Sequence, residues 1–412
     1  MLVQNVERRG MIAMLQELRA SLMGLSVFRP LLGEPLMERL RALLDHLVRG
    51  EGEPALEDYV QVFYLLQEAG YDGPGGWLWD RLRYLDSPYP AALARGACPA
   101  ALEGAARQDV DTLSRLAGLD CGALTDALAG LLPPAFSSAL ARLPRWEKGL
   151  PFTFEELRRF YQVHGSGRFA QYRAFLWYDG SLIPVASPDC PAEDEMLGYT
   201  RQREQVIANT RAFLEGQQVN DVLLYGDSGT GKSATVKTLL SVPGFDALRL
   251  IEIQKDGLRD MAGLIRSLAG RQQKFILFID DLAFDQDDRT YSLVKTILEG
   301  GLERRPNNVA IYATSNRRLL VRQTFSDRAG DEVDRQETIQ EKTALSDRFG
   351  LRIPYLALSK GEFLDLAVEI CRRQGVDLPE EAVRREAVRW DMRSPNRTPR
   401  GARQFAASLR AR

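Results

Sequence analysis

A glycine-rich stretch, "YGDSGTGKSAT", constrains the fold of this chain more than any other feature. Residues Gly226 to Ser233 match the pattern G-x-x-x-x-G-K-[ST], and the apolar run "NDVLLY" precedes them, as a buried strand would. Glycines allow backbone conformations that a side chain would block, so that successive N–H groups can point inward at an anion. A glycine-rich turn without a ligand is the alternative, and it is disfavoured because pattern and setting agree. The stretch therefore predicts a loop that binds phosphate.

The chemistry of the loop predicts how a nucleotide would be held. Lys232 would reach the β- and γ-phosphates, and Ser233 would give its hydroxyl to Mg²⁺. The helix that begins near Lys232 would direct its positive end at the charge. The residues expected to contact the nucleotide in this loop are Asp227, Ser228, Gly229, Thr230, Gly231, Lys232, Ser233 and Ala234.

The composition is that of an ordinary globular protein. The 412 residues are 45% hydrophobic and 27% charged, which allows two or three domains with separate cores. A formal net charge of −2 gives no global attraction to nucleic acid or to an anionic membrane. The four scattered cysteines form no C-x-x-C pair, which disfavours a zinc site and suits a reducing compartment. Since the sequence has no run of about 18 apolar residues and no signal-peptide pattern, we predict a cytoplasmic, soluble protein.

Changes of pattern divide the chain into four predicted regions. Leucines at three- and four-residue spacing indicate helices in the first, where His46 is expected to be structural. The dipeptide Asp179-Gly180 between two β-like runs signals a hairpin in the second. The regions are a helical domain over 1–165, a β-hairpin and linker over 166–194, an α/β nucleotide-binding domain over 195–358, and a helical lid over 359–412.

Five apolar runs alternate with helical segments in the third region. They are nearly unbroken in hydrophobicity, as expected for a parallel sheet that is buried on both faces. Strands that alternate with helices predict an α/β layer fold with right-handed crossovers. The runs are "DVLLYG", "LRLIEI", "KFILFID", "NVAIYATSN" and "LRIPYLAL".

Two acids end the third of these runs. The carboxyl end of a parallel strand is where open α/β sheets bind ligands. Asp280 would hold Mg²⁺ through its water shell opposite Ser233, and Asp281 would orient or deprotonate the attacking water. The alternative is a solvated acidic loop, since three more aspartates follow within seven residues.

Other polar residues extend the predicted site. Asn316, with Thr314 and Ser315, ends the next strand and could hold a water or touch the γ-phosphate. Arg348 could neutralise charge on a transferring phosphoryl group, often in a neighbouring subunit, or could be a helix-end arginine paired with carboxylates. Arg403 begins a helix within an arginine-rich C-terminus, which suits either a cationic lid over phosphate or a nucleic-acid patch.

The order and spacing of these motifs resemble the AAA+ ATPases. Within them the chain looks like the bacterial family called domain of unknown function 815, and the resemblance covers roughly residues 195–408. The segments that carry it are "NDVLLYGDSGTGKSA", "FIDDLAFDQDD", "TILEGGLERRPNNVAIYATSNRRLL", "EKTALSDRFGL" and "RGARQF".

The resemblance implies a role for each matching residue. Lys232 and Ser233 would be the Walker A pair, Asp280 and Asp281 Walker B, Asn316 sensor 1, Arg348 the arginine finger and Arg403 sensor 2, with Leu197 and Gly198 against the adenine. The chain departs from the usual pattern in three ways. It has Asp281 where Glu is usual and Leu319 where His is usual, and "QKDGLRDM" lacks the aromatic-Gly pore loop of protein-threading relatives.

We therefore predict a Mg²⁺-dependent ATPase that acts as a ring or spiral, most often of six subunits in this superfamily. Hydrolysis would remodel or load an unknown partner bound by the N-terminal helices. Two alternatives stay open: a nucleotide-dependent switch with little turnover, and a nucleic-acid-dependent ATPase that resembles helicase loaders. Arg317 and Arg318 compete with Arg348 for the role of finger.

Overall fold

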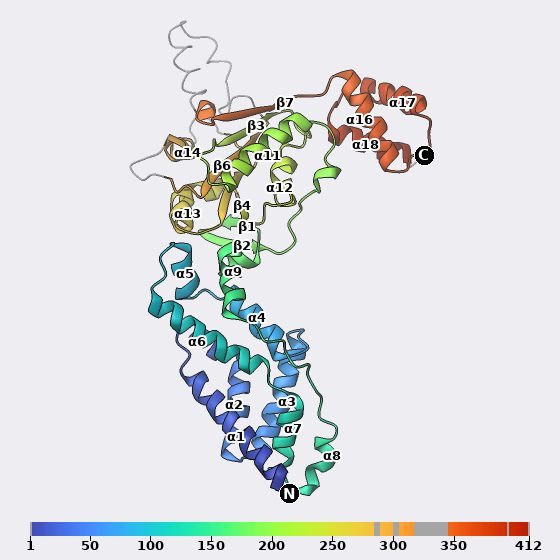
Figure 1. The fold of residues 1–412 in the computed structure, drawn as a ribbon. Coiled ribbons are helices and arrows are strands. Elements are labelled where there is room, and N and C mark those ends of the chain that lie inside the picture. The colour runs from blue at the N-terminus through green and yellow to red at the C-terminus, as the bar shows by residue number, and fades with distance from the viewer. Residues whose placement is uncertain (1, 284–288, 300–304, 317–344, 394, 411–412) are drawn as a thin grey trace. The chain divides into compact units, whose positions relative to one another are not determined.

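The computed structural model of the chain describes residues 2–283, 289–299, 305–316, 345–393 and 395–410. The chain divides into two compact units, Met1–Gln171 and Tyr172–Arg412, and each is described by itself (Figure 1). Among the described residues, no helix combines the length and apolarity needed to cross a bilayer.

Every regular element described in the first unit is a helix, which confirms the helical N-terminal region predicted from the sequence. Its leucines form one apolar core because they recur on one face of each helix. Its elements are α1 (Leu2–Met23), η1 (Arg29–Gly33), α2 (Pro35–Arg49), α3 (Gly52–Glu68), α4 (Pro74–Tyr84), α5 (Pro88–Ala94), α6 (Ala100–Ala117), α7 (Cys121–Ala129), η2 (Pro134–Phe136), α8 (Ser137–Leu140), α9 (Phe154–His164) and α10 (Gly167–Gln171).

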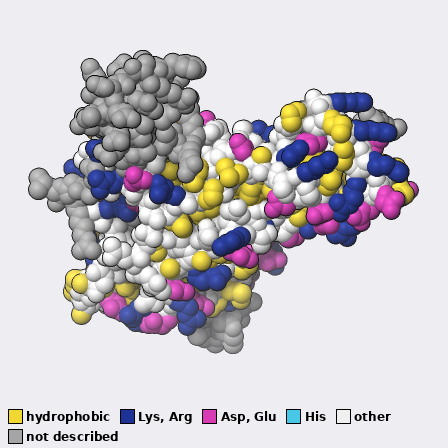
Figure 2. Space-filling model, turned by 90° about the horizontal axis from the view of Figure 1, so that it is seen from above, with side chains coloured by type: hydrophobic (Ala, Val, Ile, Leu, Met, Phe, Trp, Pro, Cys, Tyr) yellow, Lys and Arg dark blue, Asp and Glu magenta, His cyan; other side chains and the backbone are white. Residues whose placement is uncertain are grey.

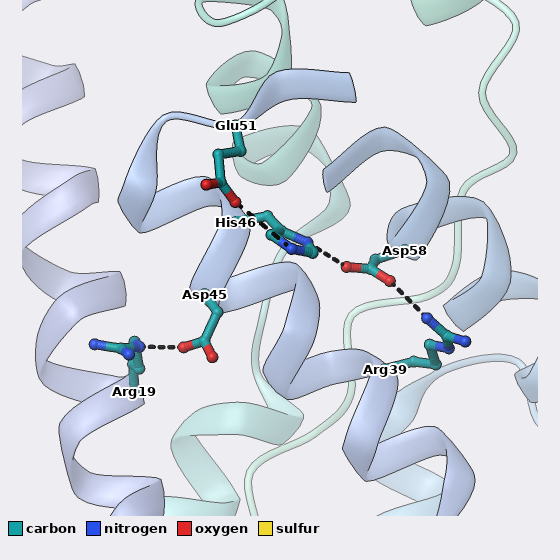
Figure 3. A network of polar contacts seen from close by, with 6 residues as sticks. All are labelled: Arg19, Arg39, Asp45, His46, Glu51 and Asp58. Carbon is teal, nitrogen blue, oxygen red and sulfur yellow. Dashed lines mark hydrogen bonds and ion pairs between the residues drawn. The ribbon is translucent and has the colours of Figure 1, made fainter. Parts of the chain in front are cut away.

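A buried carboxylate joins helices α2 and α3. Asp58 accepts hydrogen bonds from His46 Nδ1 at 2.7 Å and from Arg39 Nη1 at 3.2 Å, while Glu51 lies 3.6 Å from the other ring nitrogen of His46 (Figure 3). The Asp58 side chain is only 4% exposed, so these two partners replace the water that it lost on folding. His46 has the structural contacts expected of it.

A second buried carboxylate holds the turn after α1. Asp109 on α6 accepts the backbone N–H groups of Ser26, Val27 and Phe28 at 3.0, 2.7 and 3.0 Å. Replacing Asp109 by alanine leaves these donors unsatisfied, and we expect a loss of about 3 kcal/mol in the free energy of unfolding. Denaturant unfolding of the full chain, followed by circular dichroism, measures it. Asp111→Ala removes an exposed acid from the same helix and is the matched control; equal midpoints for both variants would contradict the prediction.

The second unit contains a seven-stranded sheet in the order β2-β1-β4-β5-β6-β3-β7. All neighbouring pairs are parallel except β1 and β2. Its elements are β1 (Ala174–Tyr178), β2 (Ser181–Val185), η3 (Glu193–Glu195), α11 (Thr200–Leu214), β3 (Val222–Gly226), α12 (Lys232–Thr238), β4 (Leu248–Ile253), η4 (Lys255–Asp260), α13 (Met261–Leu268), β5 (Lys274–Ile279), α14 (Arg289–Glu299), β6 (Val309–Ser315), β7 (Leu351–Tyr355), α16 (Lys360–Arg373), α17 (Glu380–Arg393) and α18 (Pro399–Arg410).

The five strands predicted from apolar runs are neighbours in this sheet, in the order β4-β5-β6-β3-β7, and all their pairs are parallel. The phosphate-loop strand β3 therefore lies between β6 and β7. The central strands are buried along almost their whole length because both faces are covered. The predicted fold class is confirmed in its α/β core of parallel strands with a phosphate-type loop, its helical lid and its helical N-terminal region.

The hairpin is part of the central sheet, which the sequence did not indicate. It turns at Asp179-Gly180 as predicted, but β1 also pairs in parallel with β4 from Ala174↔Leu250 to Trp177↔Ile253. The five-stranded sheet is thereby extended to seven strands. Trp177 Nε1 donates to the carbonyl of Gly257 at 3.2 Å, so the hairpin also holds η4, the segment that follows β4.

Helices α16, α17 and α18 form the lid and have a core of their own. Phe363 and Ile370 of α16 and Phe405 of α18 are among its buried residues. A capping box begins α16, because Ser359 Oγ accepts from the backbone N–H of Glu362 and the Glu362 carboxylate accepts from that of Ser359.

Candidate functional site

A cavity of about 550 Å³ lies at the carboxyl ends of the central strands. The phosphate loop, the residues after β5 and β6, the segment before α11 and the start of α18 all contribute to its wall. The lining residues are Met196, Leu197, Gly198, Tyr199, Arg203, Ser228, Gly229, Thr230, Gly231, Lys232, Ser233, Ala234, Thr235, Asp280, Asp281, Thr314, Asn316, Tyr355, Pro399, Arg400, Arg403, Gln404 and Ala407.

The glycines of the loop have the backbone conformations that their positions require. Gly226, Gly229 and Gly231 have φ angles of 134°, 79° and 96°. A Cβ on Gly226 would lie 2.3 Å from the carbonyl oxygen of Tyr355, so another residue would force β3 and β7 apart. Helix α12 begins at Lys232, directly after the loop, and its N-terminus points its N–H groups toward the cavity.

Lys232 is held inside the loop. Its Nζ donates to the carbonyls of Gly226 and Asp227 at 2.9 and 2.7 Å and to Asn316 Oδ1 at 2.9 Å. The residue is 6% exposed, and this burial lowers the pKa of its ammonium group. A bound phosphate would offer Lys232 a charged partner in place of these neutral oxygens.

The loop and the acid pair meet through one carboxylate. Ser233 Oγ donates to Asp280 Oδ1 at 2.6 Å, and Thr314 Oγ1 donates to the same oxygen at 2.5 Å. A serine hydroxyl beside a single carboxylate fits Mg²⁺, which is usually held by one or two protein oxygens, phosphate oxygens and water. Ser233 and Asp280 are therefore the residues that could hold the metal.

Asp281 has a positive φ of 52°, which is uncommon for a residue with a side chain. Its Oδ1 accepts from Asn316 Nδ2 at 2.8 Å. Since Asn316 also binds Lys232, its amide joins the cation of the loop to the second acid. These bonds form one group and the Ser233–Asp280 pair forms another, and Thr314 connects the two because its hydroxyl bonds both Asp280 and the backbone N–H of Asp281.

The segment before α11 forms the opposite wall. Leu197 and Gly198, whose contact with adenine stays a prediction, line the cavity. The ring of Tyr199 stacks on that of Tyr355 with centroids 4.9 Å apart. The Arg203 guanidinium donates to the carbonyl of Gly198. Burial raises the pKa of Tyr355 to about 12, so its hydroxyl stays protonated next to Thr235 Oγ1, 2.9 Å away.

The lid reaches the loop through α18. The backbone N–H of Arg400 donates to the carbonyl of Gly229 at 3.2 Å, and Arg403 Nη2 donates to the carbonyl of Glu195 at 3.2 Å. Both arginines line the cavity, so the lid adds two cationic residues to its wall.

Residues 170–412 match the family model described as "Protein of unknown function (DUF815)". The chain belongs to this family. The match covers more than half of the chain and includes every residue that lines the cavity.

Among solved structures, this chain is similar to RuvB of Thermotoga maritima. The Holliday junction branch migration motor RuvB is 18% identical, with a TM-score of 0.36, over 53% of this chain and 64% of that chain. Two point variants of it are 18% and 17% identical, each with a TM-score of 0.37. This chain covers less than two thirds of their length. No curated protein matches it.

Two predicted residues of this DUF815 protein lie outside the cavity wall. Asp227 turns away, and its Oδ2 accepts from the backbone N–H of Ala357 at 2.6 Å. Arg348 is exposed in the turn before β7. Arg317, Arg318 and Leu319 lie outside the described residues.

The sequence did not single out several residues of the wall. Tyr199 directly follows the predicted Gly198, and Arg203 lies one turn of helix further on. Arg400 lies three residues before the predicted Arg403. Proximity in the sequence could therefore have indicated these three residues. Tyr355 could not be predicted as part of the wall from the sequence, since it looks like one more apolar residue of its strand. Its role becomes visible only when β7 is seen to pair with β3.

Proposed function

We propose that this protein binds ATP with Mg²⁺ and hydrolyses it. The observation that carries the proposal is the hydrogen-bonded network that joins Lys232, Ser233, Asp280, Asp281 and Asn316 through Thr314 within one cavity. A cation for the β- and γ-phosphates, two oxygens for the metal, and an acid with a polar partner for the attacking water are the parts that phosphoryl transfer requires. Leu197 and Gly198 would contact the adenine, and Arg403 would contact the phosphates from the lid.

The active form in this proposal is an oligomer, a ring or a spiral, with six subunits as the first expectation. Arg348 of one protomer would complete the site of the next, because it lies outside the cavity wall of its own protomer. Nucleotide state would move the lid and act on a protein partner bound by the N-terminal helices. Remodelling or loading is favoured over threading, since η4 has no aromatic residue and its Gly257 carbonyl is bonded to Trp177.

Replacing Lys232 by alanine tests the site directly. We expect the affinity for ATP to fall about 10- to 100-fold, because a hydrogen-bonded charge contributes roughly 1.5–3 kcal/mol. Titration with a fluorescent ATP analogue measures affinity, and phosphate release with and without Mg²⁺ measures turnover. Lys237→Ala is the matched control, since Lys237 lies on the same helix and pairs with Glu252 at 3.6 Å. Absence of Mg²⁺-dependent hydrolysis by the wild type at every protein concentration would refute the proposal.

One observation favours a switch with little turnover as a second function. Asp281 is one methylene shorter than the usual Glu, and its Oδ1 is engaged by the Asn316 amide. A protein of this kind would bind ATP tightly and release phosphate slowly, with Asp281→Ala changing little.

The nucleic-acid alternative has weaker support. Within the described part of the lid, Arg384, Arg389 and Arg397 pair with carboxylates, so much of the basic charge is compensated. Basic and acidic side chains lie close together on the face of the lid in Figure 2. A steep fall of nucleic-acid binding with salt would be needed to restore this alternative.

A further inference from the structure

Thr314, near the end of β6, makes an unusual set of contacts with the acid pair. Its hydroxyl donates to Asp280 Oδ1 at 2.5 Å and accepts the backbone N–H of Asp281 at 2.9 Å. Its carbonyl accepts the backbone N–H of Leu282 at 2.7 Å. One residue of β6 therefore binds three consecutive residues that follow the neighbouring strand β5.

These contacts suit a threonine and few other residues. The Thr314 hydroxyl donates its one proton in the hydrogen bond to Asp280, and its lone pairs accept the backbone N–H of Asp281. Thr314 is 2% exposed, so water does not compete for either bond. Valine has the same shape without the hydroxyl, whereas serine keeps it.

The contacts also explain how Asp281 keeps a strained backbone. A positive φ costs free energy for a residue with a side chain and persists only when the surroundings fix it. The bond from the Asp281 N–H to Thr314 fixes the turn from one side, and the bond from Asn316 to the Asp281 carboxylate fixes it from the other.

The orientation of the Asp280 carboxylate also depends on Thr314. The Oδ1 atom of Asp280 accepts from both Ser233 and Thr314. If the Ser233 hydroxyl turns to a metal, Thr314 remains as the buried group that holds the carboxylate. Groups that orient the residues around a metal commonly change metal affinity 10- to 100-fold when removed.

We propose that Thr314 is a positioning residue that sets the Mg²⁺ affinity of the site and the geometry of Asp281. The proposal rests on the ATPase function proposed above. Although Thr314 lines the cavity, its hydroxyl is engaged by Asp280 and Asp281, so the proposal assigns it no contact with the nucleotide and its effect should depend on Mg²⁺.

The test compares Thr314→Val with Thr314→Ser. For the valine variant we expect the Mg²⁺ concentration for half-maximal hydrolysis to rise about tenfold or more and the rate at saturating Mg²⁺ to fall. Its affinity for ATP in EDTA should match that of the wild type, and serine should restore both Mg²⁺-dependent quantities. A wild-type Mg²⁺ curve and rate in the valine variant would overturn the proposal, as would an equal loss of ATP affinity with and without Mg²⁺.

Two further measurements address a valine variant that does not fold and a wild type that does not hydrolyse ATP. If the valine variant does not fold, as judged by thermal melting, Thr314→Cys takes its place, because a thiol is a weak donor and the same change in Mg²⁺ dependence is expected. If the wild type binds ATP but does not hydrolyse it, the hydrolysis proposal fails. The effect of Mg²⁺ on ATP affinity then tests Thr314 separately, and equal effects in wild type and valine variant would overturn the inference.

Discussion

Replacing Arg348 by alanine is expected to lower the rate of ATP hydrolysis about 10³-fold, while a single protomer keeps its affinity for ATP. The guanidinium is always charged, and its planar fork can neutralise charge on a transferring phosphoryl group. Arg348 is exposed in the turn before β7 and outside the cavity wall of its own protomer, so in the proposed oligomer a second copy would bring it to a phosphate. The measurement is the hydrolysis rate per protomer against protein concentration, which should rise for the wild type and stay low for the variant.

Mixing two inactive variants tests whether the arginine acts between subunits. Arg348→Ala retains its phosphate loop, and Lys232→Ala retains its arginine, so mixed assemblies should contain some intact sites and regain activity. Arg352→Ala is a local control, because Arg352 is exposed nearby and pairs with Asp347 at 2.5 Å. Full activity of Arg348→Ala, or no recovery on mixing, would direct attention to other arginines.

The Asp281→Asn substitution is the second change with a large expected effect. Asparagine has the same shape but is a far weaker base, and we expect hydrolysis to fall about 10²- to 10⁴-fold. ATP affinity should be retained, because Lys232, Ser233 and the glycine loop are untouched. Single-turnover phosphate release separates the chemical step from product release.

The control for this variant is Asp256→Asn, which removes an exposed acid from η4 without entering the cavity wall. An Asp281→Asn rate equal to that of the wild type would support the switch, in which this carboxylate does little chemistry. It would also leave the role of Asp280 in metal binding intact, since that residue is unchanged.

The parts of the fold that local sequence determines were predicted correctly. The glycine loop, its strand and the start of α12 follow from spacing and conformational preference within a dozen residues. The five core strands follow from unbroken apolar runs. Asp280, Asp281 and Asn316 come together as expected, because parallel strands end at one edge of the sheet.

Features that depend on strand neighbours could not be predicted in the same way. The bonds of Thr314 to the acid pair require β6 to lie beside β5. The pairing of β1 with β4 has a register that cannot be predicted from the sequence of either strand. The contact of Arg400 with Gly229 joins residues far apart in the chain. Arg348 is a different case, because its proposed partner belongs to another molecule.

Tyr355 has a consequence for how the protein could move. Its carbonyl accepts the N–H of Asp227, its hydroxyl lies 2.9 Å from Thr235 Oγ1, and its ring stacks on Tyr199. The chain leaves β7 at this residue and enters the lid at Lys360. A hinge between the core and the lid would therefore begin at a residue that already contacts the phosphate loop. A movement of the loop would be transmitted to the lid through a few backbone bonds.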